Sequence, residues 1–128
     1  MSSPLKLIID EREFGSVPID LLAERLAGLC TQDRAEVWLS QEDGPSLCVL
    51  KSGGRALLMF LREAGDPGMT SRSESSGMPE TLLFTLGNGQ VDEYPTAWTV
   101  AFEVARQAAE YFWFHQRPAP FVTWHDDG

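Results

Sequence analysis

Apolar residues recur at steps of three and four in two separate stretches of the chain, the spacing of one face of a helix. The first stretch covers residues 19–29, and Ser16 and Pro18 precede it as a capping hydroxyl and a first-turn proline. The second covers residues 100–115 and ends before Pro118. The pattern therefore predicts one helix that begins after Ser16 and runs to residue 29, and a second over residues 100–115.

The remaining apolar stretches alternate with polar positions or form short apolar runs between turn residues, which is typical of strands. Turns that contain glycine link several of these stretches, so the strands should form an antiparallel meander. The sequence predicts an α+β fold in which a single antiparallel sheet carries both helices on one face. The length and the absence of repeats predict a single domain over residues 1–128. The expected strands cover residues 5–10, 34–40, 47–50, 55–62, 81–86, 90–94 and 121–124.

Residues 63–79 differ from the rest because they are rich in glycine, proline and serine, including the serine-rich run 71–76. This composition predicts a long loop, and loops of that length in compact domains are usually functional or disordered. Residues 63–94 also contain six acids against one arginine, which gives a local charge of −5. The charge is compatible with a partner surface and equally with a solvated connection.

The whole chain is acidic, with 19 acidic and 10 basic residues and a formal net charge of −9. Such a surface repels nucleic-acid backbones and anionic lipids and speeds encounters with basic partners. The apolar runs are far shorter than the roughly 20 residues of a membrane-spanning helix. Residues 1–10 lack the layout of a signal peptide. We therefore expect a cytoplasmic protein that binds neither nucleic acid nor membranes.

Histidine is the first candidate for catalysis or metal binding. No nucleophile signature accompanies His115, which as the last residue of the expected helix favours the negative end of the helix dipole. His125 stands beside Asp126 and Asp127 in a polar stretch typical of a solvated tail, without the spacing of metal ligands. We expect no catalytic residue, no metal, no cofactor and no small-molecule substrate.

The two cysteines, Cys30 and Cys48, lie in separate apolar stretches. They lack the short spacing of metal-binding or redox motifs. Because free cysteine is among the most buried residue types, we expect both to be reduced residues of the core.

Residues 111–114 are four consecutive aromatic residues, and consecutive residues cannot all face one side of a helix. We expect Trp113 or Phe114 to pack under the C-terminal strand, where an aromatic ring fills the space well. An aromatic side chain that stays exposed here would instead be a candidate anchor for a partner.

The C-terminal third carries the most specific pattern in the chain. An alanine-rich amphipathic helix is followed by Tyr111-Phe112, then Gln116-Arg117-Pro118, then Val122-Thr123-Trp124. This ending resembles the first-numbered immunity family of bacterial polymorphic toxin systems. The N-terminal helix, the meander and the Gly/Ser-rich segment agree with that family in outline. The resemblance implies that Arg117, Pro118 and Trp124 are structural residues.

The same resemblance implies that the protein binds another protein. Members of the family bind one cognate toxin domain, often a nuclease or a nucleic-acid deaminase, and block its active site. A toxin of this kind needs a basic cleft, which an acidic inhibitor can occupy in place of phosphates. The candidate contact residues are the acids of the expected loops and turns: Glu42, Asp43, Asp66, Glu74, Glu80, Asp92 and Glu93.

The residues alone leave two other classes of function open. An acidic adaptor or secretion chaperone would also be small and non-catalytic, but it would hold a partly unfolded segment through apolar surface. A small enzyme would need His115 or His125 in a polar cleft, beside a carboxylate with a perturbed pKa.

Overall fold

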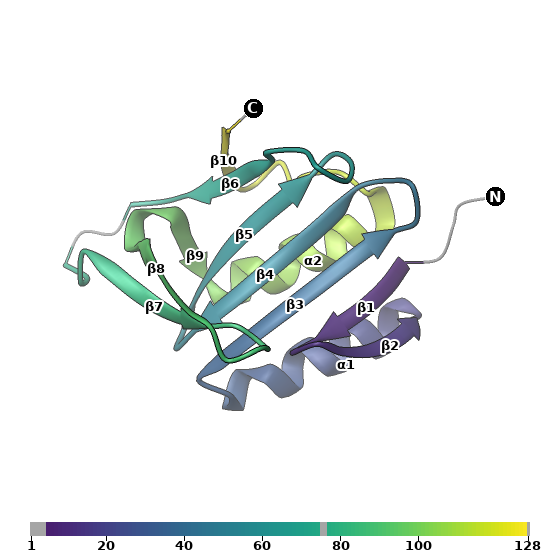
Figure 1. Ribbon diagram of the computed structural model, residues 1–128, viewed down its shortest axis with the longest axis horizontal. Coiled ribbons are helices and arrows are strands. Elements are labelled where there is room, and N and C mark those ends of the chain that lie inside the picture. Colours follow the sequence, from purple (N-terminus) through teal and green to yellow (C-terminus); the bar gives the residue numbers. More distant parts are fainter. Residues whose placement is uncertain (1–4, 75–76, 128) are drawn as a thin grey trace.

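An antiparallel sheet forms the middle of the molecule in the computed structural model, which describes residues 5–74 and 77–127 (Figure 1). Its strands are β1 (Leu5–Ile9), β2 (Arg12–Ser16), β3 (Arg34–Gln41), β4 (Ser46–Ser52), β5 (Arg55–Leu61), β6 (Met69–Arg72), β9 (Thr99–Ala101) and β10 (Thr123–Asp126). They follow the order β10-β6-β5-β4-β3-β1-β2, and β9 pairs with β5. Strands β3, β4 and β5 form the antiparallel meander that the sequence predicts.

Two α-helices, α1 (Ile19–Gly28) and α2 (Phe102–His115), lie together behind the sheet in Figure 1. Their apolar stripes face the main core, in which Leu22, Leu26 and Phe112 are almost completely buried. This arrangement confirms the α+β fold with both helices on one face. None of the helices in the described part of the chain is long and apolar enough to cross a membrane.

A separate hairpin covers part of the opposite face of the sheet. The sequence predicts its strands, β7 (Thr81–Thr85) and β8 (Val91–Pro95), but they pair with each other and not with the main sheet. Phe84 packs on Cys48 and Leu50 in a second, smaller core beneath the hairpin. Strand β4 is buried along almost its whole length because each of its faces meets a different layer. Burial on both faces explains why its apolar run is continuous and not alternating.

The N-terminal helix begins later than the sequence predicts. Ser16 is the last residue of β2 and caps nothing, since α1 starts at Ile19 after Pro18 without a side-chain capping hydrogen bond. The apolar pattern does not predict strand β2, because most of its residues are polar and incompletely buried. A tight turn at Asp10 and Glu11, with φ of 50° and 69°, brings it back beside β1.

Part of the loop expected over residues 63–79 is a strand. Strand β6 pairs with β5 and β10, and its Ser71 is 0% exposed. The Ser71 hydroxyl accepts a hydrogen bond from the Leu58 amide (3.0 Å) and donates one to the Trp98 carbonyl (2.5 Å). Polar contacts hold this strand, so a search for apolar positions misses it. Residues 75 and 76 of the serine-rich run lie outside the described residues.

The C-terminal strand lies later in the chain than the sequence predicts. His125 and Asp126 belong to β10 and not to a polar tail. The Arg62 guanidinium donates a hydrogen bond to the Asp126 carboxylate (2.6 Å), and the Asp127 amide donates one to the Gly68 carbonyl (2.9 Å). These polar contacts fix the strand at the sheet edge without a fully apolar sequence.

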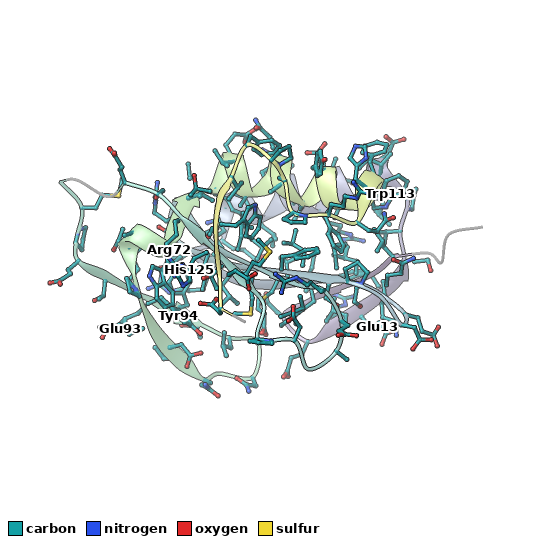
Figure 2. All side chains as sticks on the ribbon, turned by 90° about the horizontal axis from the view of Figure 1, so that it is seen from above. Glu13, Arg72, Glu93, Tyr94, Trp113 and His125 are labelled. Atoms are coloured by element: carbon teal, nitrogen blue, oxygen red, sulfur yellow. The ribbon has the colours of Figure 1, made fainter. Side chains whose placement is uncertain are left out.

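The expectation that Trp113 or Phe114 packs under the C-terminal strand is wrong. The Trp113 indole donates a hydrogen bond to the Val17 carbonyl (2.9 Å), at the end of the molecule away from His125 of β10 (Figure 2). Phe114 is 59% exposed. Phe112 is the aromatic of this run that enters the deep core, and its neighbours along the helix point elsewhere.

The two cysteines also differ from each other. Cys48 is buried between the sheet and the hairpin, but Cys30, in the short 3-10 turn η1 (Leu29–Thr31), is exposed, so the expected burial of Cys30 is wrong. Burial raises the pKa of the Cys48 thiol well above its ordinary value, and the Glu36 carboxylate raises it further.

We expect a thiol reagent to modify Cys30 in the native protein and Cys48 only after unfolding. A raised thiol pKa in the folded state also means that stability should fall as the pH rises through the ordinary thiol pKa. The measurement is the modification rate of a Cys30→Ser variant in increasing urea. Rapid modification of Cys48 without urea would contradict its burial.

Candidate protein-binding surface

The seven acids predicted to contact a partner fall into two groups at different ends of the sheet (Figure 1). The first group lies in the β3–β4 turn and in the loop before β6: Glu42, Asp43 and Asp66. The second group lies on β8 and on the segment that leads into the hairpin: Glu74, Glu80, Asp92 and Glu93. The structure therefore does not bring all seven residues into one surface.

Three of the seven carboxylates, those of Asp66, Asp92 and Glu93, already have hydrogen-bond partners within the chain. Asp66 accepts a hydrogen bond from the Arg62 amide (2.9 Å) and lies 3.2 Å from the Arg62 guanidinium, and its side chain is only 11% exposed. Asp92 accepts hydrogen bonds from the Gln90 side-chain amide (2.8 Å) and the Tyr94 hydroxyl (3.3 Å). The acids that are exposed are Glu42, Asp43, Glu74, Glu80 and Glu93.

Aromatic side chains attach the inner face of the hairpin to the sheet. Phe84 is 1% exposed, and its ring meets that of Tyr94 edge to face at 5.7 Å between centroids. Trp98, in the 3-10 turn η2 (Thr96–Trp98), lies 6.2 Å from Tyr94 and carries the Arg72 guanidinium over its ring. Burial raises the pKa of the Tyr94 hydroxyl above its ordinary value, and Asp92 raises it further. The hairpin is thus packed firmly on the sheet.

Polar contacts fix β7 and the turn that follows it as well. In the middle of the strand the Ser52 hydroxyl donates a hydrogen bond to the Leu83 carbonyl (2.7 Å). In the turn the Gly87 amide donates one to the Glu36 carboxylate (3.0 Å). A Cβ at Gly87 would lie 2.7 Å from the carbonyl carbon of Asp10, so only glycine allows this close approach.

The outer face of the hairpin is exposed and combines apolar with acidic side chains. Leu83 is 49% and Val91 is 56% exposed. Glu93 lies on the same side, away from the sheet, as Figure 2 shows, and its carboxylate accepts a hydrogen bond from the Thr81 hydroxyl (3.1 Å). The sequence contains no lysine or arginine from residue 73 to residue 105. Apolar surface beside uncompensated charge is typical of a protein-binding surface.

Sequence reasoning misses the apolar part of this surface. Successive side chains of a strand point to opposite faces of the sheet. Because the structure buries Phe84 on the inner face of the hairpin, Leu83 and Val91 must lie on the outer face. The acidic part, in contrast, is visible in the composition.

Neither histidine belongs to the hairpin, and the two lie in different elements. His115 ends α2, where its ring lies 4.4 Å from that of Tyr111 between centroids, tilted by 39°. His125 lies in β10, with its Nε2 3.5 Å from a carboxylate oxygen of Asp127. Within residues 5–74 and 77–127, no cluster of three metal-ligating side chains is formed.

A buried lysine is the other polar feature that the sequence analysis misses. Lys51 is 4% exposed, and its ammonium group donates hydrogen bonds to the carbonyls of Gln32 and Gly53 and lies 5.1 Å from the Phe102 ring centre. It lines a cavity of about 560 Å³ beside the first turn of α2. The carbonyl oxygens and the ring compensate the buried charge, so Lys51 ties η1 to the β4–β5 turn.

The fold and the hairpin surface together define a small acidic α+β domain suited to binding another protein. The family model described as Immunity protein Imm1 matches residues 17–126, and the chain belongs to this family of immunity proteins. The match covers both helices, the hairpin and the C-terminal strand. It confirms the resemblance drawn from the C-terminal pattern. No curated protein matches the sequence significantly.

Proposed function

We propose that this immunity protein binds a cognate toxin domain in the cytoplasm of the producing cell and neutralises it by covering the toxin's active site, without catalysing a reaction. Membership of the immunity-protein family supports the binding of a toxin. The chemistry that the site offers is recognition through charge and apolar contact, since its exposed groups are carboxylates and aliphatic side chains.

The class of toxin that fits best is one that acts on nucleic acid, such as a nuclease or a deaminase. The observation that carries this proposal is the acidic surface around the hairpin, in a chain whose net charge is −9. A nucleic-acid-processing domain binds phosphates in a basic cleft, and exposed carboxylates compete for the same positive charges. Opposite charges also raise the rate at which the two proteins meet.

The test is to co-express the protein with toxin domains encoded by neighbouring genes and to purify the complex. We expect a one-to-one complex in which the nuclease or deaminase activity of the toxin is lost. A toxin domain that stays fully active when bound would contradict occlusion. Binding to nucleic acid alone, without a protein partner, would contradict the proposed class.

Charge reversal on the hairpin should slow the formation of this complex. We expect Glu93→Lys to lower the association rate constant about tenfold at low salt and less at high salt, because salt screens long-range steering. Stopped-flow mixing at several salt concentrations measures this rate. Glu24→Lys, the same charge change on exposed α1, is the matched control and should have a much smaller effect.

A second candidate function is an adaptor or secretion chaperone. Two exposed aromatic side chains favour it: Phe114 is 59% and Phe121 is 51% exposed, and both are suited to holding an apolar segment. For this function we expect binding to unfolded segments of a secreted protein, lost in a Phe114→Ser, Phe121→Ser double variant. Binding only to the folded toxin domain would exclude it.

A further inference from the structure

Strand β8 forms an open edge of the hairpin. In the described part of the chain, β8 has one strand neighbour, β7. Strand β7 is the hairpin strand that contacts β3 and β4, so the free edge of β8 is on the side of the hairpin away from those contacts. One side of β8 is therefore available for another strand.

The hydrogen-bond pattern shows which main-chain groups face this edge. The Leu86 amide donates to the Gln90 carbonyl (2.8 Å), so these two residues form a hydrogen-bonded pair next to the turn. Directly opposite residues in an antiparallel ladder alternate between hydrogen-bonded and non-hydrogen-bonded pairs. In the observed register Val91 and Glu93 are then in non-hydrogen-bonded pairs. Their N–H and C=O groups point away from β7.

An independent contact supports this assignment. Leu83 is opposite Glu93, so the Leu83 carbonyl should also point away from its partner strand. It does so, because it accepts the hydrogen bond from the Ser52 hydroxyl on the side facing the sheet. Among residues 5–74 and 77–127, no group hydrogen-bonds to the outward amides and carbonyls of Val91 and Glu93. Val91 is 56% exposed, so a strand can reach them.

The charge of the edge restricts what can pair with it. Asp92 and Glu93 are adjacent on β8, and none of the ion pairs among the described residues involves either of them. A second copy of β8 would bring carboxylates together, and like charges on paired strands are destabilising. A segment with lysine or arginine would instead form opposite-charge pairs.

The two edges of the main sheet are less open. Strand β2 is paired irregularly with β1, with a register shift and Gly15 at a φ of 70°, and such bulges discourage the addition of a strand. Strand β10 has only four residues, and its Asp126 is paired with Arg62.

We infer that β8 is a docking edge for an extended basic segment of the toxin domain, which adds to the β7–β8 hairpin as a third strand. This inference rests on the proposed function for the identity of the partner. Main-chain hydrogen bonds at Val91 and Glu93 supply affinity, and the acids select a basic sequence. Val91, 56% exposed on the outer face of β8, provides apolar contact for a neighbouring side chain of the added strand.

Val91→Pro tests the edge directly. Proline removes the outward N–H of residue 91 but no hydrogen bond to β7, and edge strands accept proline at such a position. We expect the affinity for the toxin domain to fall at least about tenfold, since a donor of the added strand is lost and its partner is left unpaired. Val91→Thr is the matched control, because it keeps the N–H and the β-branched shape, and its affinity should change little.

Amide hydrogen exchange of the unmodified protein is a second test of the docking edge, and it does not require the Val91→Pro variant to fold. In the free protein the Val91 and Glu93 amides should exchange fast, and in the complex slowly. The Asp92 and Tyr94 amides, which face β7, should be protected in both states and serve as the internal control.

The outcomes separate the two proposals. A toxin that is bound and neutralised while the Val91 and Glu93 amides stay unprotected, or while Val91→Pro binds as well as Val91→Thr, overturns the docking edge and leaves the proposed function intact. A toxin domain that does not bind the unmodified protein at all overturns the proposed function.

Discussion

Phe112→Ala is expected to lower the free energy of unfolding by about 3–5 kcal/mol, the usual cost of removing a fully buried aromatic side chain. Phe112 is 0% exposed and lies between α2 and the sheet, where its ring meets Phe60 edge to face at 6.1 Å between centroids. Few neighbours could move to fill the space, because the helix and the central strands are both fixed. Urea denaturation followed by circular dichroism measures the loss.

Phe114→Ala is the matched control for this prediction. It makes the same chemical change two residues further along the same helix, but Phe114 is 59% exposed. We expect a change of at most about 0.5 kcal/mol, as for most surface substitutions. Equal losses for the two variants would contradict the packing of α2 described above.

The loss of stability should also appear as a loss of immunity in cells. A domain of this size is stable by only about 5–15 kcal/mol, so Phe112→Ala removes a large fraction of the total. The folded concentration of the protein should fall although no residue of the hairpin surface has changed. Reduced protection by Phe112→Ala is therefore no sign that α2 contacts the toxin.

The parts of the fold that the sequence predicts are those whose burial is apolar and periodic. Helix α2 is found because Ala105 and Phe112 belong to a regular apolar pattern that matches one buried face. The meander is found because its strands either alternate or, like β4 around Val49, form a short apolar run between turn residues. Strands β2 and β6 are missed because hydrogen bonds and strand pairing hold them. Ser71 shows the difference most clearly: it is a serine with no exposed surface, fixed by two main-chain partners.

The candidate surface is predictable in its chemistry but not in its geometry. Composition identifies the acids, yet nothing local in the sequence shows that Asp66 is used internally by Arg62 whereas Glu93 is exposed. That distinction depends on tertiary contacts. One signal for the hairpin layer does exist: the continuous apolar run of β4 indicates a strand covered on both faces, and so a second layer opposite the helices.

Phe84→Ala is expected to have an effect of similar size on stability and to remove the docking edge as well. Phe84 is 1% exposed and is the residue of the hairpin that enters the second core, over Cys48 and Leu57. We expect a loss of about 3–5 kcal/mol if the protein unfolds as one unit. If the hairpin detaches on its own, the free energy of global unfolding falls by less. The hairpin amides then lose their protection from hydrogen exchange before the rest of the protein does.

The titration of Tyr94 distinguishes these two results. Burial raises the pKa of its hydroxyl in the folded protein, so the folded state should lose stability as the pH rises above the ordinary tyrosine pKa. Detachment of the hairpin exposes Tyr94, and its pKa should fall towards the ordinary value in Phe84→Ala. Ultraviolet absorbance of the tyrosinate form measures this change, with Tyr94→Phe to identify the signal.

Leu83→Ala is the matched control for the hairpin, since Leu83 neighbours Phe84 in sequence but faces outward and is 49% exposed. It should change the free energy of unfolding by at most about 0.5 kcal/mol and leave the Tyr94 pKa raised. Leu83→Ala should weaken toxin binding without lowering stability, because the leucine side chain belongs to the outer face and not to the core. A Leu83→Ala protein that is as unstable as Phe84→Ala would mean that the two faces of the hairpin are assigned the wrong way round.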